Sequence, residues 1–310
     1  MEETLRAFAA YSWCLYNTKF HMALKNAIRK VRNESDVTDL LKIVLAGYIF
    51  ERQGASPYFR WKALELVRQG LHNAPDQFWE NFTEGANGVN EMCNPLRYDE
   101  NHPERNLLCF FQDSQRIQEI VNNLGNSEII IQTYKALDNI RGVGHKIASF
   151  ILRDISMAVE SRFAVGIQQD GDNVYWRMQP VDTWIKFTAT QIGLCQEANR
   201  EIKAAREICN RCIAAGVNPL RFNAGAWYFG AGVMRCREQL REILSVGCDH
   251  SRARLLLQAG LNRDVYEEEV FNDAYIRPTI ADNSVRDHLI TGIRECMDAN
   301  MLAEIENNNH

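Results

Sequence analysis

Two glycines separated by a single residue lie between two segments of helical apolar spacing, and no other feature constrains the fold as strongly. Upstream, Ile130, Tyr134 and Leu137 recur at helical intervals behind a capping residue at Asn126 or Ser127. Downstream, a second apolar stripe follows, made of Ile147, Phe150, Ile151, Ile155 and Ala158. Glycine adopts backbone angles that a side chain forbids, so Gly142 and Gly144 suit a tight turn. The sequence therefore predicts a helix–hairpin–helix over 127–158.

The same hairpin predicts a site for an anion. Backbone N–H groups at the start of a helix attract negative charge, and a DNA phosphate is one such anion. Lys146 adds an amine in the first turn of the second helix, and Lys135 and Arg153 add positive charge nearby. The predicted DNA contacts in the hairpin are Arg141, Gly142, Val143, Gly144 and His145.

Composition favours a mostly helical protein of one large domain or two closely packed domains. The chain has 310 residues, 46% of them apolar, and only seven prolines, and its periodic runs are long. No segment has the apolar length of a membrane span, and the N-terminus lacks a signal-peptide pattern. Nine cysteines are read as reduced thiols, which predicts an intracellular protein, cytoplasmic or, in a eukaryote, nuclear. A net charge of −5 argues mildly against nucleic acid, but a local basic face is sufficient for phosphate contacts.

Periodicity and capping predict helices along most of the chain. The expected helical ranges are 2–32, 36–53, 57–70, 75–83, 114–125, 182–193, 196–215, 232–246, 250–259 and 284–304. The stretch 84–107 has no usable periodicity, and 160–179 could form a short β-hairpin. The run from Asn223 to Tyr228 is rich in helix-breaking residues and suggests a close approach of two backbones. No internal repeat is found.

Asp182 follows Pro180 and Val181 at the head of a predicted helix. The simpler interpretation is that its side chain only caps that helix, accepting hydrogen bonds from the free N–H groups of the first turn. The same position also holds a carboxylate in the partial positive charge of a helix N-terminus, which favours the ionised form. The residue alone does not decide between the two interpretations.

Together, these motifs resemble the helix-hairpin-helix DNA glycosylase superfamily. The match rests on Gly142, Val143, Gly144 and Lys146, followed by the Pro-Val-Asp sequence at 180–182, and the wider pattern covers about residues 35–245. The resemblance implies an all-α fold of two helical subdomains with the active-site cleft between them. The chain is then one catalytic unit over 1–310, with additional helices at 1–34 and 246–310 packing on the core.

Two departures from the family pattern stand out. The hairpin begins with Ile140-Arg141-Gly142 where the family usually has Leu-Pro-Gly, and the separation from Lys146 to Asp182 is longer than in most branches. The longer connection resembles the archaeal 8-oxoguanine glycosylases more than endonuclease III.

The resemblance implies a bifunctional glycosylase and AP lyase that acts on double-stranded DNA as a monomer without a cofactor. Lys146 attacks the sugar as a neutral amine and forms a Schiff base that permits β-elimination, and Asp182 stabilises positive charge on the sugar. The damaged base, 8-oxoguanine first, is flipped into a pocket. Gln53 would fill the vacated stack, and Trp184, Trp227 and Tyr228 are pocket candidates for which core packing is the stronger interpretation.

Other interpretations stay open. One is a glycosylase for oxidised, deaminated or hypermodified pyrimidines, and another is a non-catalytic module that uses the hairpin only to clamp phosphate. Cys209 and Cys212, with Cys248 and His250 downstream, have spacing that makes a zinc site conceivable. The cysteine pair falls within a helical pattern and is read as buried thiols, so no metal is expected.

Overall fold

The computed structural model describes residues 1–50, 56–84, 91–169, 174–262 and 284–307. In these ranges the chain forms helices and turns with no β-strand, which confirms the all-α class. None of the helices in these ranges has the length and apolarity needed to cross a membrane.

Short helices and turns make up the first half of the chain, up to the end of the hairpin. The elements are α1 (Glu2–Ala10), α2 (Ser12–Tyr16), α3 (Lys19–Glu34), α4 (Thr38–Val44), the π-helix η1 (Leu45–Phe50), α6 (Pro57–Arg68), η2 (Leu71–Asn73), α7 (Pro75–Thr83), η3 (Glu91–Leu96), η4 (Pro103–Arg105), α8 (Leu107–Gln112), α9 (Ser114–Asn122), α10 (Ser127–Asn139) and α11 (Gly144–Ala158).

The second half is also helical. Its elements are α12 (Arg162–Val165), η6 (Tyr175–Met178), α13 (Thr183–Gln191), α14 (Glu201–Ala214), α15 (Pro219–Tyr228), the π-helix η7 (Phe229–Met234), α16 (Arg237–Leu244), α17 (Asp249–Leu261), α18 (Ser284–Cys296) and α19 (Ala299–Asn307).

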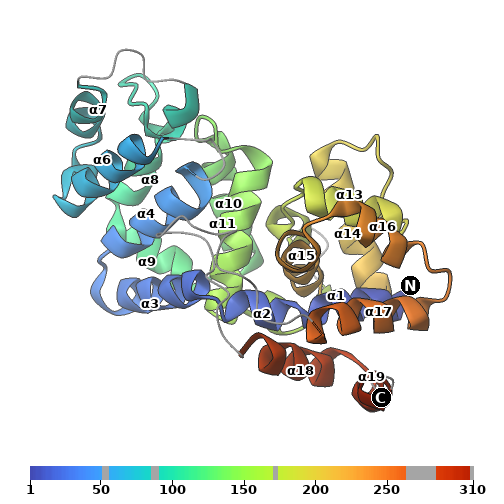
Figure 1. Cartoon of the computed structure of the whole chain (residues 1–310). Helices are drawn as coiled ribbons and strands as arrows, with labels where there is room; N and C mark the ends of the chain where they lie inside the picture. The colour runs from blue at the N-terminus through green and yellow to red at the C-terminus, as the bar shows by residue number, and fades with distance from the viewer. Residues whose placement is uncertain (51–55, 85–90, 170–173, 263–283, 308–310) are drawn as a thin grey trace.

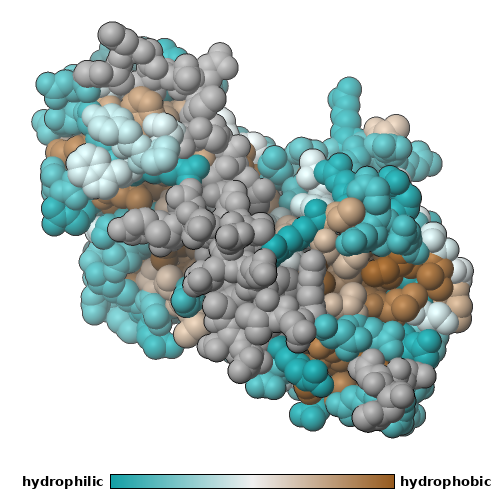
Figure 2. Space-filling view, viewed as in Figure 1, coloured by the Kyte–Doolittle hydropathy of each residue, from teal (hydrophilic) through white to brown (hydrophobic). Residues whose placement is uncertain are grey.

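These helices gather in two groups, with α3–α11 on the left of Figure 1 and α13–α19 on the right. The N-terminal helices do not stay with the first group, because α1 packs against α15, α17 and α18. The long apolar helix α11 contacts α3 and α10 on one side and η6 and α14 on the other. Polar residues cover most of the described surface on the face shown in Figure 2.

Two local expectations are wrong. The range 2–32 is not one helix, because the chain breaks near Tyr11 and again at Asn17, and the Thr18 side chain then caps α3 by accepting from the His21 N–H. The possible β-hairpin at 160–179 is also absent from the described part of that stretch, which forms α12 and η6. Residues 170–173 lie outside the described ranges.

The expected helix break between Asn223 and Tyr228 is likewise wrong, but the close backbone approach is confirmed. These residues belong to α15, and Gly225 faces α1. A Cβ atom at Gly225 would lie 1.7 Å from the backbone oxygen of Phe8. Glycine is needed here because two helix backbones touch, and the cost of its low helix propensity is offset by that packing.

Replacing Gly225 with alanine should therefore destabilise the fold, although alanine is the better helix former. The added methyl group meets the backbone of α1, which cannot move aside as a side chain can, so we expect a loss of at least about 3 kcal/mol. Chemical denaturation measures the change. Gly247→Ala is the matched control, because a Cβ atom at Gly247 meets nothing within 4 Å. Equal stabilities of the two variants would contradict the packing argument.

Candidate nucleic-acid interface and active site

The hairpin at 140–144 joins α10 to α11 as the sequence predicts. Gly142 has φ of 78° and Gly144 has φ of 59°, values that favour glycine, and both residues are exposed. The N-cap residue Val143 provides no side-chain hydrogen bond to the first turn of α11. Val143 therefore does not compete with an anion for the backbone N–H groups at this helix start.

Lys146 lies half-buried in the first turn of α11. With the residues that the structure describes it makes no hydrogen bond or ion pair, although carboxylates elsewhere on the surface pair with several other lysines and arginines. The Lys146 amine is therefore not held by a carboxylate of the described structure.

The side chain of His145 does not face outward, so its imidazole makes no direct DNA contact, and a contact through the backbone N–H of this residue stays a prediction. The residue is 7% exposed, and its Nδ1 lies 2.9 Å from the Tyr134 hydroxyl and 3.3 Å from the Ser149 hydroxyl. Burial lowers the pKa of His145 to about 4, against the opposing effect of the Gln179 backbone. A neutral, buried imidazole therefore packs between α10 and α11 on the Tyr134 and Ser149 hydroxyls, and its Nε2 has no hydrogen-bond partner among the described residues.

Asp182 caps α13. Its Oδ1 accepts hydrogen bonds from the backbone N–H groups of Trp184 at 3.0 Å and Ile185 at 2.9 Å. Its Oδ2 has no hydrogen bond among the described residues, and the side chain is half-buried. The capping and functional interpretations are therefore compatible, because one oxygen is used for the cap and the other is left for a ligand.

A buried polar network ties α11 to the backbone just before Asp182. Arg153 bonds through Nη1 to the Asn223 amide oxygen at 2.5 Å, and the Asn223 amide nitrogen donates to the Pro180 carbonyl at 3.0 Å. Arg153 is 1% exposed and forms an ion pair with Asp154 at 2.8 Å. Arg153 is therefore not part of a basic surface around the hairpin, and that expectation is wrong.

This connection places Lys146 and Asp182, the pair that the sequence predicts, on a common framework. Arg153, through Asn223, connects the third turn of α11 to the Pro180 carbonyl. No hydrogen bond or ion pair joins Lys146 to Asp182 directly in the described structure. The segment that carries Asp182 is nevertheless held against the helix that carries Lys146.

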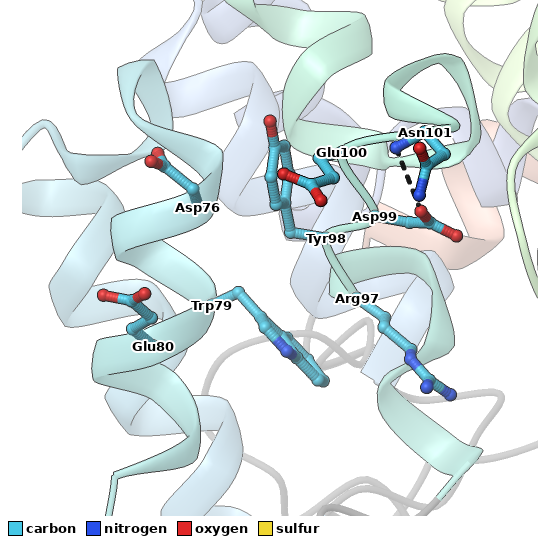
Figure 3. Close-up of a pocket in the computed structure, with 8 residues that line it drawn as sticks. All are labelled: Asp76, Trp79, Glu80, Arg97, Tyr98, Asp99, Glu100 and Asn101. Carbon is cyan, nitrogen blue, oxygen red and sulfur yellow. Dashed lines mark hydrogen bonds between the residues drawn. The ribbon is translucent and has the colours of Figure 1, made fainter.

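Next to the hairpin, Arg141 is half-buried and partly neutralised. Its backbone N–H donates to the Arg105 carbonyl at 3.0 Å, and its guanidinium lies 3.4 Å from the Asp99 carboxylate. Asp99 lines a pocket of about 660 Å³ between α7 and the loop at 97–101, where carboxylates and the rings of Trp79 and Tyr98 meet (Figure 3). Because carboxylates dominate its lining, this pocket is unsuited to DNA phosphate.

A group of residues that the sequence did not single out packs beneath the hairpin. Arg177 and Arg206 lie 4.3 Å and 4.7 Å from the centre of the Trp176 ring, which also contacts the rings of Tyr134 and His145. The only sequence signal was the Trp-Arg pair within the irregular stretch 160–179, whose position in space depends on packing. The two guanidinium groups supply the positive charge near the hairpin that Arg153 does not.

The other predicted site residues divide between core and surface. Tyr228 is 1% exposed and belongs to the core, which supports the packing interpretation. Trp184 and Trp227 are partly buried against the core, and Trp184 packs on Gly230, where a Cβ atom would lie 2.8 Å from the indole. Gln53 lies outside the described residues.

Cys209, Cys212, Cys248 and His250 do not form a cluster. Cys209 and Cys212 are buried in α14, whereas Cys248 is exposed and His250 bonds to Glu3 and Glu304. Within the described ranges, no group of three or more metal-ligating side chains is found.

Comparison with known proteins does not place the chain in a family. No protein-family model matches it, and neither a curated protein nor a solved structure does.

The buried histidine predicts a specific loss of stability in acid. The folded-state pKa of His145 is depressed to about 4, so as the pH falls below 6.5 the unfolded chain binds a proton that the folded chain does not. Its stabilising effect is complete above 6.5 and is lost as the pH falls toward 4. From pH 7 to pH 4.5 we expect the wild type to lose about 2 kcal/mol more than His145→Gln.

Denaturant titrations at several pH values measure this difference. His102→Gln is the matched control, because His102 is exposed and should leave the wild-type pH profile unchanged. A wild-type profile in His145→Gln would show that the buried imidazole is not responsible.

Proposed function

We propose that the chain is a bifunctional DNA glycosylase and AP lyase with the helix-hairpin-helix glycosylase fold. Its substrate is a damaged base in double-stranded DNA, with 8-oxoguanine as the first to test. One observation carries the proposal. A glycine hairpin leads into α11, whose first turn holds Lys146 without an ion pair. The segment that ends at Asp182 is anchored to the same helix, and one oxygen of that carboxylate has no hydrogen bond among the described residues.

In this proposal the hairpin binds a DNA phosphate through its backbone amides. Gly144 keeps the turn open to the approach of a phosphate, because no atom lies within 4 Å of the position that a Cβ atom would take there. Arg177 and Arg206 add positive charge at the side, where no carboxylate pairs with them among the described residues. The net charge of −5 is compatible with this interface, because the carboxylates lie elsewhere, as around the pocket at Asp99.

The proposed chemistry uses two groups, the Lys146 amine on α11 and the Asp182 carboxylate at the start of α13. The neutral amine of Lys146 attacks C1′ of the flipped nucleotide, and the bond to the base breaks, with its electron pair leaving on the base. Positive charge on the sugar is stabilised by the Oδ2 side of Asp182. Ring opening then produces a Schiff base, loss of the C2′ proton breaks the C3′–O bond, and hydrolysis releases the lysine.

Borohydride trapping tests the role of Lys146. The wild type should form a covalent adduct with a duplex that contains at least one lesion, 8-oxoguanine first and oxidised or deaminated pyrimidines next, and Lys146→Gln should form none. Lys135→Gln is the matched control, because Lys135 is an exposed lysine on α10 of the same hairpin. Failure of every lesion to give an adduct, or an undiminished adduct in Lys146→Gln, would overturn the Schiff base. Duplex binding without any adduct would instead indicate a non-catalytic phosphate clamp.

Asp182→Asn separates the chemical role from the capping role. Asparagine caps a helix about as well as aspartate, so the free energy of unfolding should change by no more than about 0.5 kcal/mol. Base release should nevertheless be abolished while duplex binding is retained, because only the negative charge is lost. Asp182→Ala should in addition lose about 1 kcal/mol of stability through loss of the cap. Wild-type base release by Asp182→Asn would show that the residue acts as a cap alone.

A further inference from the structure

A second polar cavity lies away from the hairpin, at the junction of α1, α2, α15 and α18. Its volume is about 380 Å³, within the range of sites for small molecules. Its lining includes Arg6, Trp13, Val165, Ile167, Arg221 and Glu295. None of the groups in the proposed glycosylase chemistry belongs to it.

The main feature of this cavity is the guanidinium of Arg221. It lies 3.9 Å from the centre of the Trp13 ring and donates to the Ser12 hydroxyl at 3.3 Å. It forms no ion pair with any described residue, and burial lowers its pKa against the opposing effect of Tyr16 and of more minor neighbours. A largely buried guanidinium with one neutral hydrogen bond and no carboxylate is incompletely compensated.

The unused N–H groups of Arg221 are reached from the cavity. None of its nitrogen atoms is among the enclosed atoms that lack a hydrogen-bond partner. The residue lines the cavity, so its remaining donors face the open space. Since a guanidinium presents its donors in a planar fork, it matches the two oxygens of a carboxylate or phosphate.

Arg6 borders the same cavity but is already paired. Two of its nitrogens donate to the Glu2 carboxylate at 3.0 Å and 2.7 Å, and the third donates to the Cys296 carbonyl at 3.4 Å. Glu295 also borders the cavity without reaching ion-pair distance from Arg221. Arg221 is therefore the cation that remains for an incoming anion.

The rim of the cavity is apolar. Val165 is 67% exposed and Ile167 is 38% exposed, which is unusual for large aliphatic side chains, and Ala9 and Val217 continue the apolar lining. A ligand that fits would have an oxyanion at one end and a compact apolar body at the other.

We propose that this cavity binds a small organic oxyanion, a carboxylate or phosphate attached to a compact apolar group, with Arg221 as its principal ligand. Val165 and Ile167 cover the apolar part of the ligand, and Arg6 stays paired with Glu2 at the border of the cavity. This site is independent of the hairpin and of the glycosylase proposal.

Isothermal titration calorimetry at constant ionic strength tests the proposal with benzoate and phenyl phosphate as probes. At least one should bind saturably in a 1:1 ratio, and the stronger of the two identifies the oxyanion that the site prefers. Benzamide, which has nearly the shape of benzoate without its charge, should not bind detectably. Arg221→Gln should weaken binding at least tenfold, because a charge-assisted pair of hydrogen bonds is lost.

Two further variants keep the test decisive if Arg221→Gln folds poorly. Ile167→Glu places a negative charge on the exposed rim and should weaken binding of the anion severalfold without disturbing the core. Arg211→Gln, on the exposed face of α14, is the matched control and should keep the wild-type affinity. Binding of neither probe, equal binding of benzamide, or unchanged affinity in both Arg221→Gln and Ile167→Glu would overturn the proposal.

Discussion

The buried ion pair between Arg153 and Asp154 is the interaction on which the arrangement of this molecule depends. Asp154 also accepts from the Tyr48 hydroxyl at 2.8 Å and the Tyr16 hydroxyl at 3.3 Å, and lies 3.5 Å from His21. Burial alone would raise the pKa of Asp154, but the neighbouring Arg153 and His21 keep it well below its usual range. Removing one partner from such a pair typically costs about 3–5 kcal/mol, because the other charge stays buried without compensation. The N-terminal helices and η1 are thus held to the middle of α11.

The same ion pair reaches the second group of helices through Asn223 on α15. This amide bonds to Arg153 with its oxygen and to the Pro180 carbonyl with its nitrogen, so both of its polar atoms are used. Pro180 lies two residues before Asp182. The buried charge of Arg153 therefore also positions the Asp182 carboxylate. The same hydrogen-bond network stabilises the core and supports the candidate site.

Features that depend on local chemistry could be predicted from the sequence, whereas features that depend on tertiary packing could not. The hairpin, the N-cap role of Asp182 and the all-α class follow from glycine positions, capping residues and apolar spacing, which act within a few residues. The assignment of Arg153 to a basic surface and any side-chain contact of His145 with DNA were wrong, because both side chains point into the core, whereas a contact through the His145 backbone N–H stays a prediction. Neither error was avoidable from spacing, since α11 is apolar on most of its faces and a polar residue on it can be buried wherever a partner exists.

By itself the sequence determined a chain of helices with a glycine hairpin before Lys146 and a carboxylate at the head of a later helix. Only the tertiary structure decided which helices pack together and which buried polar groups bond to one another. Asn223 is 70 positions from Arg153 in the chain, and the backbone contact that requires Gly225 joins α15 to the distant α1. Such contacts are set by how whole helices pack and by the need to satisfy every buried polar group, and no local pattern of residues records that outcome.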